Sequence, residues 1–281
     1  MDDRCKTCFT NSYDKLLKKF PLSGCESLEF CAFFNRLMDD DEDKSTPLIQ
    51  RELLHKFWDM NGIPDPYLKE KKQSNRIALK LYKQWKPKVL ASANPFSLSL
   101  RLAIAGNIMD YGTDQEFDVH ETIQKAMIAE FAIDDSALLM QRIKEAKNIL
   151  YLGDNAGEIV FDKLFLETIN HTHLVYAVRG APVLNDATLK DAREMGIDLV
   201  ADVISNGYDA PSTVLSQCSS EFLEVYNSAD LIISKGQGNL EGLITGHDPR
   251  LFFLLMVKCD VIGEALNVKK GSLVIYNQNE N

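Results

Sequence analysis

Residues 148–158 read Asn-Ile-Leu-Tyr-Leu-Gly-Asp-Asn-Ala-Gly-Glu, a short apolar run that ends in a polar turn with two glycines. Before this stretch, apolar residues recur mainly at helical spacing, as in residues 28–38 and 77–85. After it, short apolar runs alternate with helical stretches. We therefore predict a mostly helical subdomain over residues 1–146, forming a wall or lid, and an α/β domain over residues 147–281.

Four further apolar runs resemble residues 149–152. They span residues 174–178, a weaker 199–204, 231–233 and 273–276, the last of which closes the chain. Strands that alternate with helices need crossover connections, and these produce a parallel sheet covered on both faces. The sequence therefore predicts an α/β fold: a doubly wound, mainly parallel sheet with helices on both faces, preceded by the helical subdomain.

The overall charge argues against two classes of partner. The chain has 281 residues, and its 31 Lys and Arg against 41 Asp and Glu give a formal charge of −10. Such a charge opposes the phosphate neutralisation that nucleic acids and anionic membranes require. Residues 1–5 lack a signal-peptide pattern, and no apolar run approaches the ~20 residues that span a bilayer. We expect a cytoplasmic protein of unknown oligomeric state with no nucleic-acid or membrane partner.

Polar turns follow three of the apolar runs, at residues 153–158, 179–186 and 234–241. In an open parallel sheet, ligands bind beyond the carboxyl ends of the strands. The three turns could therefore meet at one rim of the sheet and form a single site.

Two of these turns carry oxygen ligands of the kind that hard cations prefer. Asp154, Asn155 and Asp186 would supply two carboxylates and one amide oxygen, which suit Mg²⁺ or Mn²⁺. Nickel or cobalt are other ions that such a site could accept. No histidine or cysteine adjoins the turns, which argues against catalytic zinc. Each residue also has an ordinary explanation as a turn or helix cap, and the coincidence of three turns favours the functional interpretation.

The third turn has features of an anion site. Lys235 could pair with phosphate oxygens, while Gly236 and Gly238 would let backbone N–H groups approach an anion at a helix N-terminus. The spacing is not that of a P-loop. A lysine in a glycine-rich loop is also commonly a solvated surface residue.

Together these turns resemble the damage-control phosphatases, formerly catalogued as domain of unknown function eighty-nine. The resemblance rests on residues 153–158 followed by Phe161-Asp162, on Val178-Arg179-Gly180 leading to residues 185–188, and on residues 234–241. Residues 105–110 also match a family segment, and the Cys-x-x-Cys start at residues 5–8 is similar to that of the prokaryotic branch. The resemblance therefore covers most of the chain.

The resemblance implies a metabolite-repair phosphatase that uses a divalent metal. By it, Asp154, Asn155 and Asp186 fall on the family's metal-ligand positions, and Lys235 falls on a lysine associated with the phosphate. Six further residues would line the cleft: Glu158, Arg179, Asn239, Glu241, Asn107 and Asp110.

The cysteines leave several interpretations open. They are Cys5, Cys8, Cys25, Cys31, Cys218 and Cys259. Cys5 and Cys8 have zinc-ligand spacing, but no second Cys-x-x-Cys is present, so a site would need Cys25, Cys31 or Cys259 from elsewhere in the fold. Buried or inert thiols, a disulfide and a metal site are all compatible with the sequence.

The sequence thus predicts a metal-dependent phosphatase that hydrolyses small phosphorylated metabolites, such as sugar phosphates or nucleotide-related compounds. Asp154, Glu158 and Lys235 would act in catalysis, with Glu158 orienting the attacking water. A covalent route through Asp154 is the alternative mechanism. A non-catalytic sensor of phosphometabolites would use the same rim. An S-adenosylmethionine-dependent methyltransferase is a weaker alternative, because it gives the oxygen ligands no task.

Overall fold

The computed structural model describes residues 1–39, 45–106 and 119–278, with the side chains of residues 119–122 excepted. The helices are α1 (Asp3–Lys19), α2 (Gly24–Asp39), α3 (Thr46–Asn61), α4 (Leu68–Leu90), α5 (Pro95–Gly106), α6 (Val119–Ile128), α7 (Ser136–Glu145), α8 (Glu158–Ile169), α9 (Leu189–Glu194), α10 (Ser220–Ser228), α11 (Gly236–Leu243) and α12 (Asp260–Ala265). The strands are β1 (Phe131–Asp134), β2 (Ile149–Leu152), β3 (Leu174–Val178), β4 (Asp202–Ser205), β5 (Leu231–Lys235), β6 (Leu251–Met256) and β7 (Leu273–Asn277).

The seven strands form one sheet in the order β1-β7-β6-β5-β2-β3-β4. The pairing of β6 with β7 is antiparallel, and the other five pairings are parallel. From β2 the chain moves through β3 to β4, and β5 then returns to the other side of β2. The strand order therefore reverses between β2 and β5, and in sheets of this kind ligands bind beyond the carboxyl ends at such a reversal.

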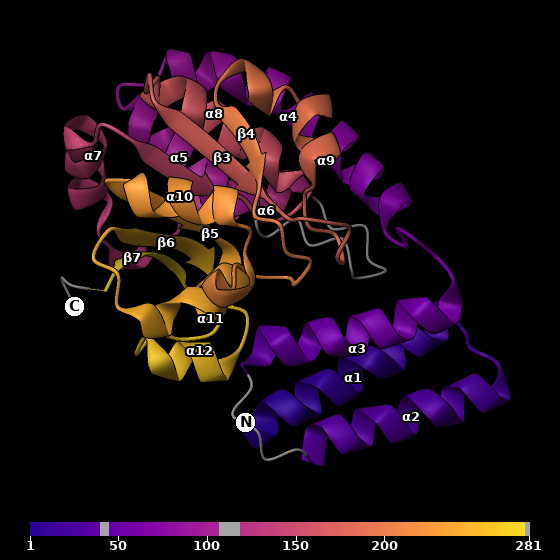
Figure 1. Cartoon of the computed structure of the whole chain (residues 1–281). Helices are drawn as coiled ribbons and strands as arrows, with labels where there is room; N and C mark the ends of the chain where they lie inside the picture. Colours follow the sequence, from indigo (N-terminus) through magenta and orange to yellow (C-terminus); the bar gives the residue numbers. More distant parts are fainter. Residues whose placement is uncertain (40–44, 107–118, 279–281) are drawn as a thin grey trace.

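Helices cover both faces of the sheet, as predicted (Figure 1). Every residue of β2 is buried, because its side chains alternate between two cores. Ile149 and Tyr151 pack with residues of α4, α5 and α8, whereas Leu150 and Leu152 pack with residues of α10, α11 and α12. Burial on both faces explains why the sequence of this strand is continuously apolar.

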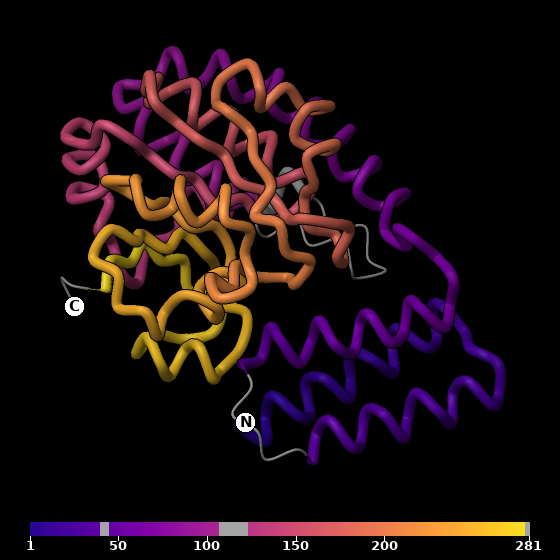
Figure 2. Tube along the Cα trace, viewed as in Figure 1, coloured from indigo at the N-terminus to yellow at the C-terminus, as the bar shows by residue number. Residues whose placement is uncertain are grey.

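The first three helices form a separate bundle beside the α/β part (Figure 2). Their aromatic residues, including Phe30 and Phe57, pack in a core of their own. Val183, from the loop after β3, belongs to the same core and attaches the bundle to the α/β part. The chain leaves α3 at Gly62, whose φ of 68° is the left-handed conformation that commonly ends a helix.

Two strands lie outside the predicted runs. β1 falls within the part predicted to be helical, and β6 falls between the last two predicted runs. Because β1 pairs with β7, the sheet begins before residue 147, and the predicted boundary is wrong in this respect. Helices α4 and α5 pack on α8 against the sheet, so only α1–α3 stand apart.

The other predicted strands agree with the structure to within a few residues. The runs at 149–152, 174–178, 231–233 and 273–276 coincide with β2, β3, β5 and β7. The weaker run begins in a 3-10 turn, and its strand, β4, starts only at Asp202. Within the described ranges, no helix is both long and apolar enough to cross a membrane.

Candidate active site

The turns after β2 and β3 are joined by backbone hydrogen bonds. The amide of Ala187 donates to the carbonyl of Asp154 at 2.8 Å, and the amide of Ala156 donates to the carbonyl of Asn185 at 2.9 Å. Asn155 and Asp186 face each other across an antiparallel bridge. The two predicted turns therefore form one rigid unit at the carboxyl ends of neighbouring strands.

This unit brings the three predicted metal ligands together. The side-chain nitrogen of Asn155, Nδ2, donates to Oδ2 of Asp154 at 2.9 Å, and the bridge sets Asp186 beside them. Asp154, Asn155 and Asp186 are 6%, 8% and 3% exposed. Among the residues described, no three His, Cys, Asp or Glu side chains gather as a metal site, so the predicted set depends on the amide oxygen of Asn155.

Arg179 holds the two aspartates. Its Nε donates to Oδ2 of Asp186 at 2.6 Å, and its Nη2 donates to Oδ1 of Asp154 at 3.2 Å. Its Nη1 donates to Oδ1 of Asn239 at 2.8 Å. Although burial opposes the charged guanidinium, Asp186 and Asp154 raise the pKa of Arg179 above its usual value. The predicted cleft residue Arg179 thus orients both carboxylates.

The positive charges near Asp154 do not offset its burial and the negative charges around it. Burial raises the pKa of its carboxyl well above the ordinary value, and the nearby charges of Asp186 and Glu158 raise it further. Arg179 and Lys258 lower it, but by less. In the ionised state this carboxylate would be stabilised by additional positive charge.

Lys235 lies beneath the turn after β2 and is fully buried. Its Nζ donates to Oε1 of Glu158 at 2.6 Å, to Oδ1 of Asp162 at 2.5 Å and to the carbonyl of Ala103 at 2.9 Å. Burial disfavours the ammonium, yet Asp162 and Glu158 outweigh it and raise the pKa of Lys235. The ammonium has three N–H donors, and these three acceptors match them.

This arrangement differs from the role predicted for Lys235. Contact with a phosphate stays a prediction, because the ammonium would first have to leave one of its three partners. Glu158 is also fully buried, and its Oε2 lies 3.4 Å from the backbone nitrogen of Asn155. The described position of Glu158 supports the turn, and its predicted contact with an attacking water likewise stays a prediction.

Asn239 joins the third turn to the first. Its Nδ2 donates to the carbonyl of Lys235 at 2.8 Å and to the carbonyl of Gly153 at 3.2 Å. Its Oδ1 accepts from Arg179 and from Thr213. The carboxyl ends of β2 and β5 are therefore held together through this buried amide.

The remaining predicted residues of the third turn have separate positions. Gly236 has a φ of 78°, and it begins α11, whose N-terminus carries the positive end of the helix dipole. A Cβ at Gly238 would lie 2.3 Å from the carbonyl oxygen of Pro211, so packing explains this glycine. Glu241 accepts from Gln237 at 2.9 Å and contacts none of the predicted metal ligands in the contacts described. Asn107 and Asp110 lie outside the described residues.

Two supporting residues lie outside the predicted set. Asp162 lies one turn beyond Glu158 in α8 and also accepts from the hydroxyl groups of Tyr151 and Tyr176, both at 2.7 Å. Its helical spacing from Glu158 is a signal that the sequence carries. Asn75 of α4 accepts from the amide of Gly157 at 2.6 Å, and nothing in its local sequence indicates this contact.

Lys258 is a further residue that sequence reasoning missed. It follows the carboxyl end of β6, and its charge acts on both Asp154 and Glu241. Its backbone amide donates to Oε1 of Gln237 in the first turn of α11 at 2.8 Å. Recognition of the apolar run at residues 251–256 as a strand would have drawn attention to it.

The cysteines are free thiols in the structure. None of the six is fully buried, since Cys5, Cys218 and Cys259 are half-buried and the others are exposed, and whether the thiols are inert stays untested. Burial raises the pKa of Cys5, and the charges of Asp2, Glu241 and Cys259 raise it further. Cys259 thus lies within electrostatic range of the Cys-x-x-Cys segment, and a disulfide or a metal site there stays untested.

The buried side chains of the site do not balance in charge. Four carboxylates, which we call the carboxylate cluster, belong to Asp154, Glu158, Asp162 and Asp186, and each is at most 6% exposed. Arg179 and Lys235 are the cations buried among them. With all six groups ionised, four negative and two positive charges leave a formal charge of −2. A divalent cation would neutralise this cluster.

Several known proteins are similar to this chain in sequence. A damage-control phosphatase of Pyrococcus horikoshii is 32% identical over an alignment that covers 96% of this chain and 95% of the relative. A damage-control phosphatase of Archaeoglobus fulgidus is 33% identical over 78% of each chain. The mouse 4'-phosphopantetheine phosphatase is 26% identical over 47% of this chain and 18% of the relative.

A solved structure is similar to this chain in fold. The crystal structure of a DUF89 family protein from Pyrococcus horikoshii matches with a TM-score of 0.90 and 31% sequence identity, and the match covers 99% of this chain and 98% of that one. The sequence model of the family described as damage-control phosphatase ARMT1-like domain matches residues 1–274. The predicted resemblance is thereby confirmed, and the chain belongs to the damage-control phosphatase ARMT1-like family.

Proposed function

We propose that this chain is a phosphatase that hydrolyses small phosphorylated metabolites with the help of one divalent cation. Family membership supports the reaction class. The observation that carries the proposal for this chain is the meeting of the turns after β2, β3 and β5 around Arg179 and Asn239, at the reversal of strand order. This position is where an open α/β sheet binds its ligands.

The donor set fits a hard divalent ion. Asp154, Asn155 and Asp186 offer oxygen ligands, and the formal charge of −2 on the buried groups matches the charge of Mg²⁺ or Mn²⁺. When bound, such an ion would draw electron density from a phosphoryl oxygen and favour attack at phosphorus. Arg179 would keep the two aspartates in place, because it bonds one oxygen of each.

The phosphate would be held by groups at the rim. The N-terminus of α11 presents backbone N–H groups and the positive end of the helix dipole. Lys258, at the end of β6, would add a positive charge on the same side, since its charge already acts on Asp154. Lys235 and Glu158 would contribute by keeping the first turn rigid, and Asn239 would keep the first and third turns together.

Two nucleophiles fit the reaction. A water molecule could attack phosphorus directly, with an acidic group of the site taking its proton. The carboxylate of Asp154 could instead attack, release the alcohol and leave an aspartyl-phosphate that water then hydrolyses. Rapid quench with labelled substrate separates the two routes, because only the second leaves label on the protein.

The experiment that tests the function measures phosphate release from a panel of metabolite phosphates. Protein freed of metal with a chelator would be assayed alone and with Mg²⁺, Mn²⁺, Ni²⁺ or Co²⁺. We expect release only with added metal, and a loss of at least 100-fold in Asp154→Ala. The matched control is Asp202→Ala, which removes an exposed carboxylate at the opposite, amino end of β4 and should leave the rate unchanged.

Metal binding has its own readout. A ligand that binds only the folded state raises stability by about 2.7 kcal/mol at 100 times its dissociation constant. Saturating metal should therefore raise the melting temperature of the wild type and of Asp202→Ala, but not that of Asp154→Ala. Full activity in Asp154→Ala would contradict the site assignment. Metal and phosphate binding without any release would favour a sensor.

A further inference from the structure

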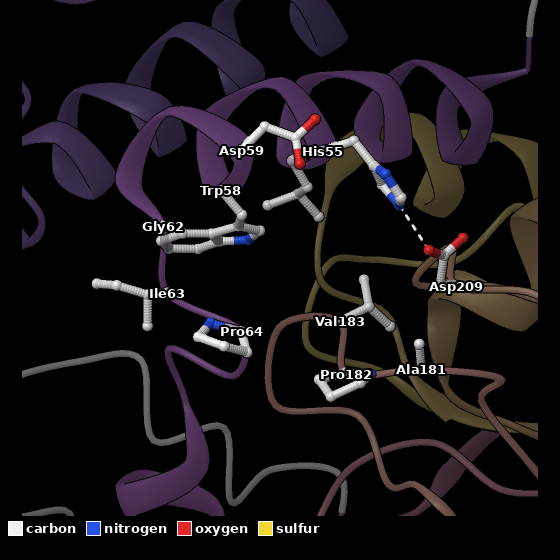
Figure 3. Close-up of a pocket in the computed structure, with 11 residues that line it drawn as sticks. His55, Trp58, Asp59, Gly62, Ile63, Pro64, Ala181, Pro182, Val183 and Asp209 are labelled. Atoms are coloured by element: carbon white, nitrogen blue, oxygen red, sulfur yellow. Dashed lines mark hydrogen bonds and ion pairs between the residues drawn. The ribbon is translucent and has the colours of Figure 1, made fainter.

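A cavity of about 390 Å³ lies between α3 and the loops of the α/β part (Figure 3). In the figure, Trp58 projects from α3 toward Pro64, and Val183 and Pro182 face them from the opposite side. Ile63 completes the apolar part of the wall. None of its described lining residues belongs to the carboxylate cluster.

The cavity shares its loops with the carboxylate cluster. The loop that follows β3 supplies residues 181–183 to the cavity and, a few residues on, Asp186 to the cluster. A second loop supplies Asp209 to the cavity, and its Thr213 accepts from Arg179 at 3.4 Å. The two loops are joined where the amide of Gly180 donates to the carbonyl of Tyr208 at 2.8 Å. The cavity and the cluster are also joined directly, because the amide of Asp186 donates to the carbonyl of the lining residue Val183 at 3.0 Å.

Carboxylates predominate among the charged groups of the cavity. Nε2 of His55 lies 2.6 Å from one oxygen of Asp209, and Nε of Arg51 lies 2.5 Å from the other. Both oxygens of Asp209 are therefore engaged, one by the lining residue His55 and the other by Arg51, which lies outside the lining. Asp59, one turn after His55 in α3, adds an exposed carboxylate to the lining. An anionic group that entered the cavity would meet the carboxylate of Asp59. The described lining residues include no lysine or arginine, and their one histidine, His55, is already paired with Asp209.

We propose that this cavity receives the part of the substrate that does not carry the reacting phosphate, and that it selects an uncharged, hydroxyl-bearing group with an apolar face. Trp58, Ile63 and Pro64 would cover the apolar face, while His55 and Asp59 would hydrogen-bond the hydroxyl groups. Asp59 would repel a second phosphate or a carboxylate on the same substrate. The proposal rests on the proposed phosphatase function, and it adds a rule for which substrates are accepted.

The test compares a hexitol monophosphate with the corresponding hexitol 1,6-bisphosphate. With the metal-loaded full chain, kcat/KM should be higher for the monophosphate. In Asp59→Lys, the ratio of kcat/KM for the bisphosphate to that for the monophosphate should rise at least fivefold. The matched control, Glu224→Lys, reverses an exposed charge on α10 outside the cavity and should leave the ratio unchanged. A smaller rise in Asp59→Lys, or an equal rise in Glu224→Lys, would overturn the proposal.

A binding measurement separates this proposal from the proposed reaction. Saturation-transfer NMR detects weak binding of the phosphate-free hexitol, which needs no turnover. The wild type should give a signal, and Ile63→Trp, which fills the cavity from a loop, should reduce it at least fivefold while keeping the wild-type circular dichroism. Absence of phosphate release would count against the phosphatase alone. Absence of the hexitol signal, or an equal signal in Ile63→Trp, would count against the proposed role of the cavity in substrate binding.

Discussion

The ammonium of Lys235 lies 2.6 Å from Oε1 of Glu158, and neither side chain is exposed to solvent. The contact links the end of β5 to the first turn of α8, and Asp162 shares the same ammonium at 2.5 Å. Removal of one partner from a buried ion pair leaves an uncompensated charge, which costs about 3–5 kcal/mol. The contact therefore supports the turn that carries the predicted metal ligands.

We expect Lys235→Met to lower the free energy of unfolding by about 3–5 kcal/mol in urea denaturation, because two buried carboxylates lose their cation. The double variant Lys235→Met/Asp162→Asn should lose less than the sum of the two single variants, since the second change removes one of the stranded charges. Groups in one network commonly show coupling of about 0.5–3 kcal/mol. Strict additivity, or a loss below about 1 kcal/mol in Lys235→Met, would show that the pair is not formed.

Asn75→Ala should disturb the first turn from outside the sheet. The amide of Gly157 would lose its acceptor, Oδ1 of Asn75, which lies 2.6 Å away in a buried position. An unsatisfied buried donor costs about 1–3 kcal/mol. We expect a loss of stability of that size together with a fall in phosphate release of at least tenfold. Arg76→Ala, which truncates the exposed neighbouring residue, should change neither, and equal effects in the two variants would contradict the contact.

The same contact shows which parts of the site are readable in the sequence. The turns after β2, β3 and β5 are local patterns, because an apolar run and the residues that end it are adjacent in the chain. Their convergence follows from the geometry of a parallel sheet. Asn75, in contrast, lies 82 residues from Gly157, and only the packing of α4 on α8 brings them together.

The fold follows the same division. β2 and β5 are buried throughout, β2 reads as an unbroken apolar run, and β5 opens with the apolar run at residues 231–233. β1 has an edge position, is only four residues long and alternates between half-buried and exposed residues, so its sequence blends with the helices around it. The burial of Lys235 could not be predicted from the local sequence either, because its acceptors come from two helices, α5 and α8.

Gly157→Ala should destabilise the protein through the backbone. Gly157 has a φ of 82°, and a Cβ there would lie 3.0 Å from Cβ of Ser74. With a ψ of −49°, this is a sparsely populated backbone region that costs about 1–3 kcal/mol for a residue with a side chain, and the contact would add to this cost. We expect a loss of at least that size in urea denaturation. The control, Gly246→Ala, has no atom within 4 Å of the added Cβ and should change stability much less. Equal losses would argue against a special backbone at Gly157.

Asp209→Asn should weaken the attachment of the helical bundle in a pH-dependent way. Burial alone would raise the pKa of Asp209, but the hydrogen bond from Arg51 and the charge of His55 more than offset it, so the pKa lies below its ordinary value. A lowered pKa means that the carboxylate stabilises the fold above the unfolded pKa of about 3.9, and that this contribution is lost as the pH falls through the folded value. The stability difference between the wild type and Asp209→Asn should therefore be largest at pH 7 and should shrink as the pH falls to 3.

The size of this effect is limited by solvent, since the side chains of Arg51, Asp209 and His55 are 29%, 22% and 43% exposed. Partly exposed ion pairs contribute about 0.2–1 kcal/mol, which high salt reduces further. Urea denaturation at pH 7, 5, 4 and 3 would measure the difference, and Asp198→Asn, at an exposed carboxylate in the 3-10 turn before β4, gives the matched control. A difference that is the same at pH 7 and pH 3 would mean that Asp209 acts through its shape and not through its charge, because an asparagine and a protonated aspartic acid are both neutral.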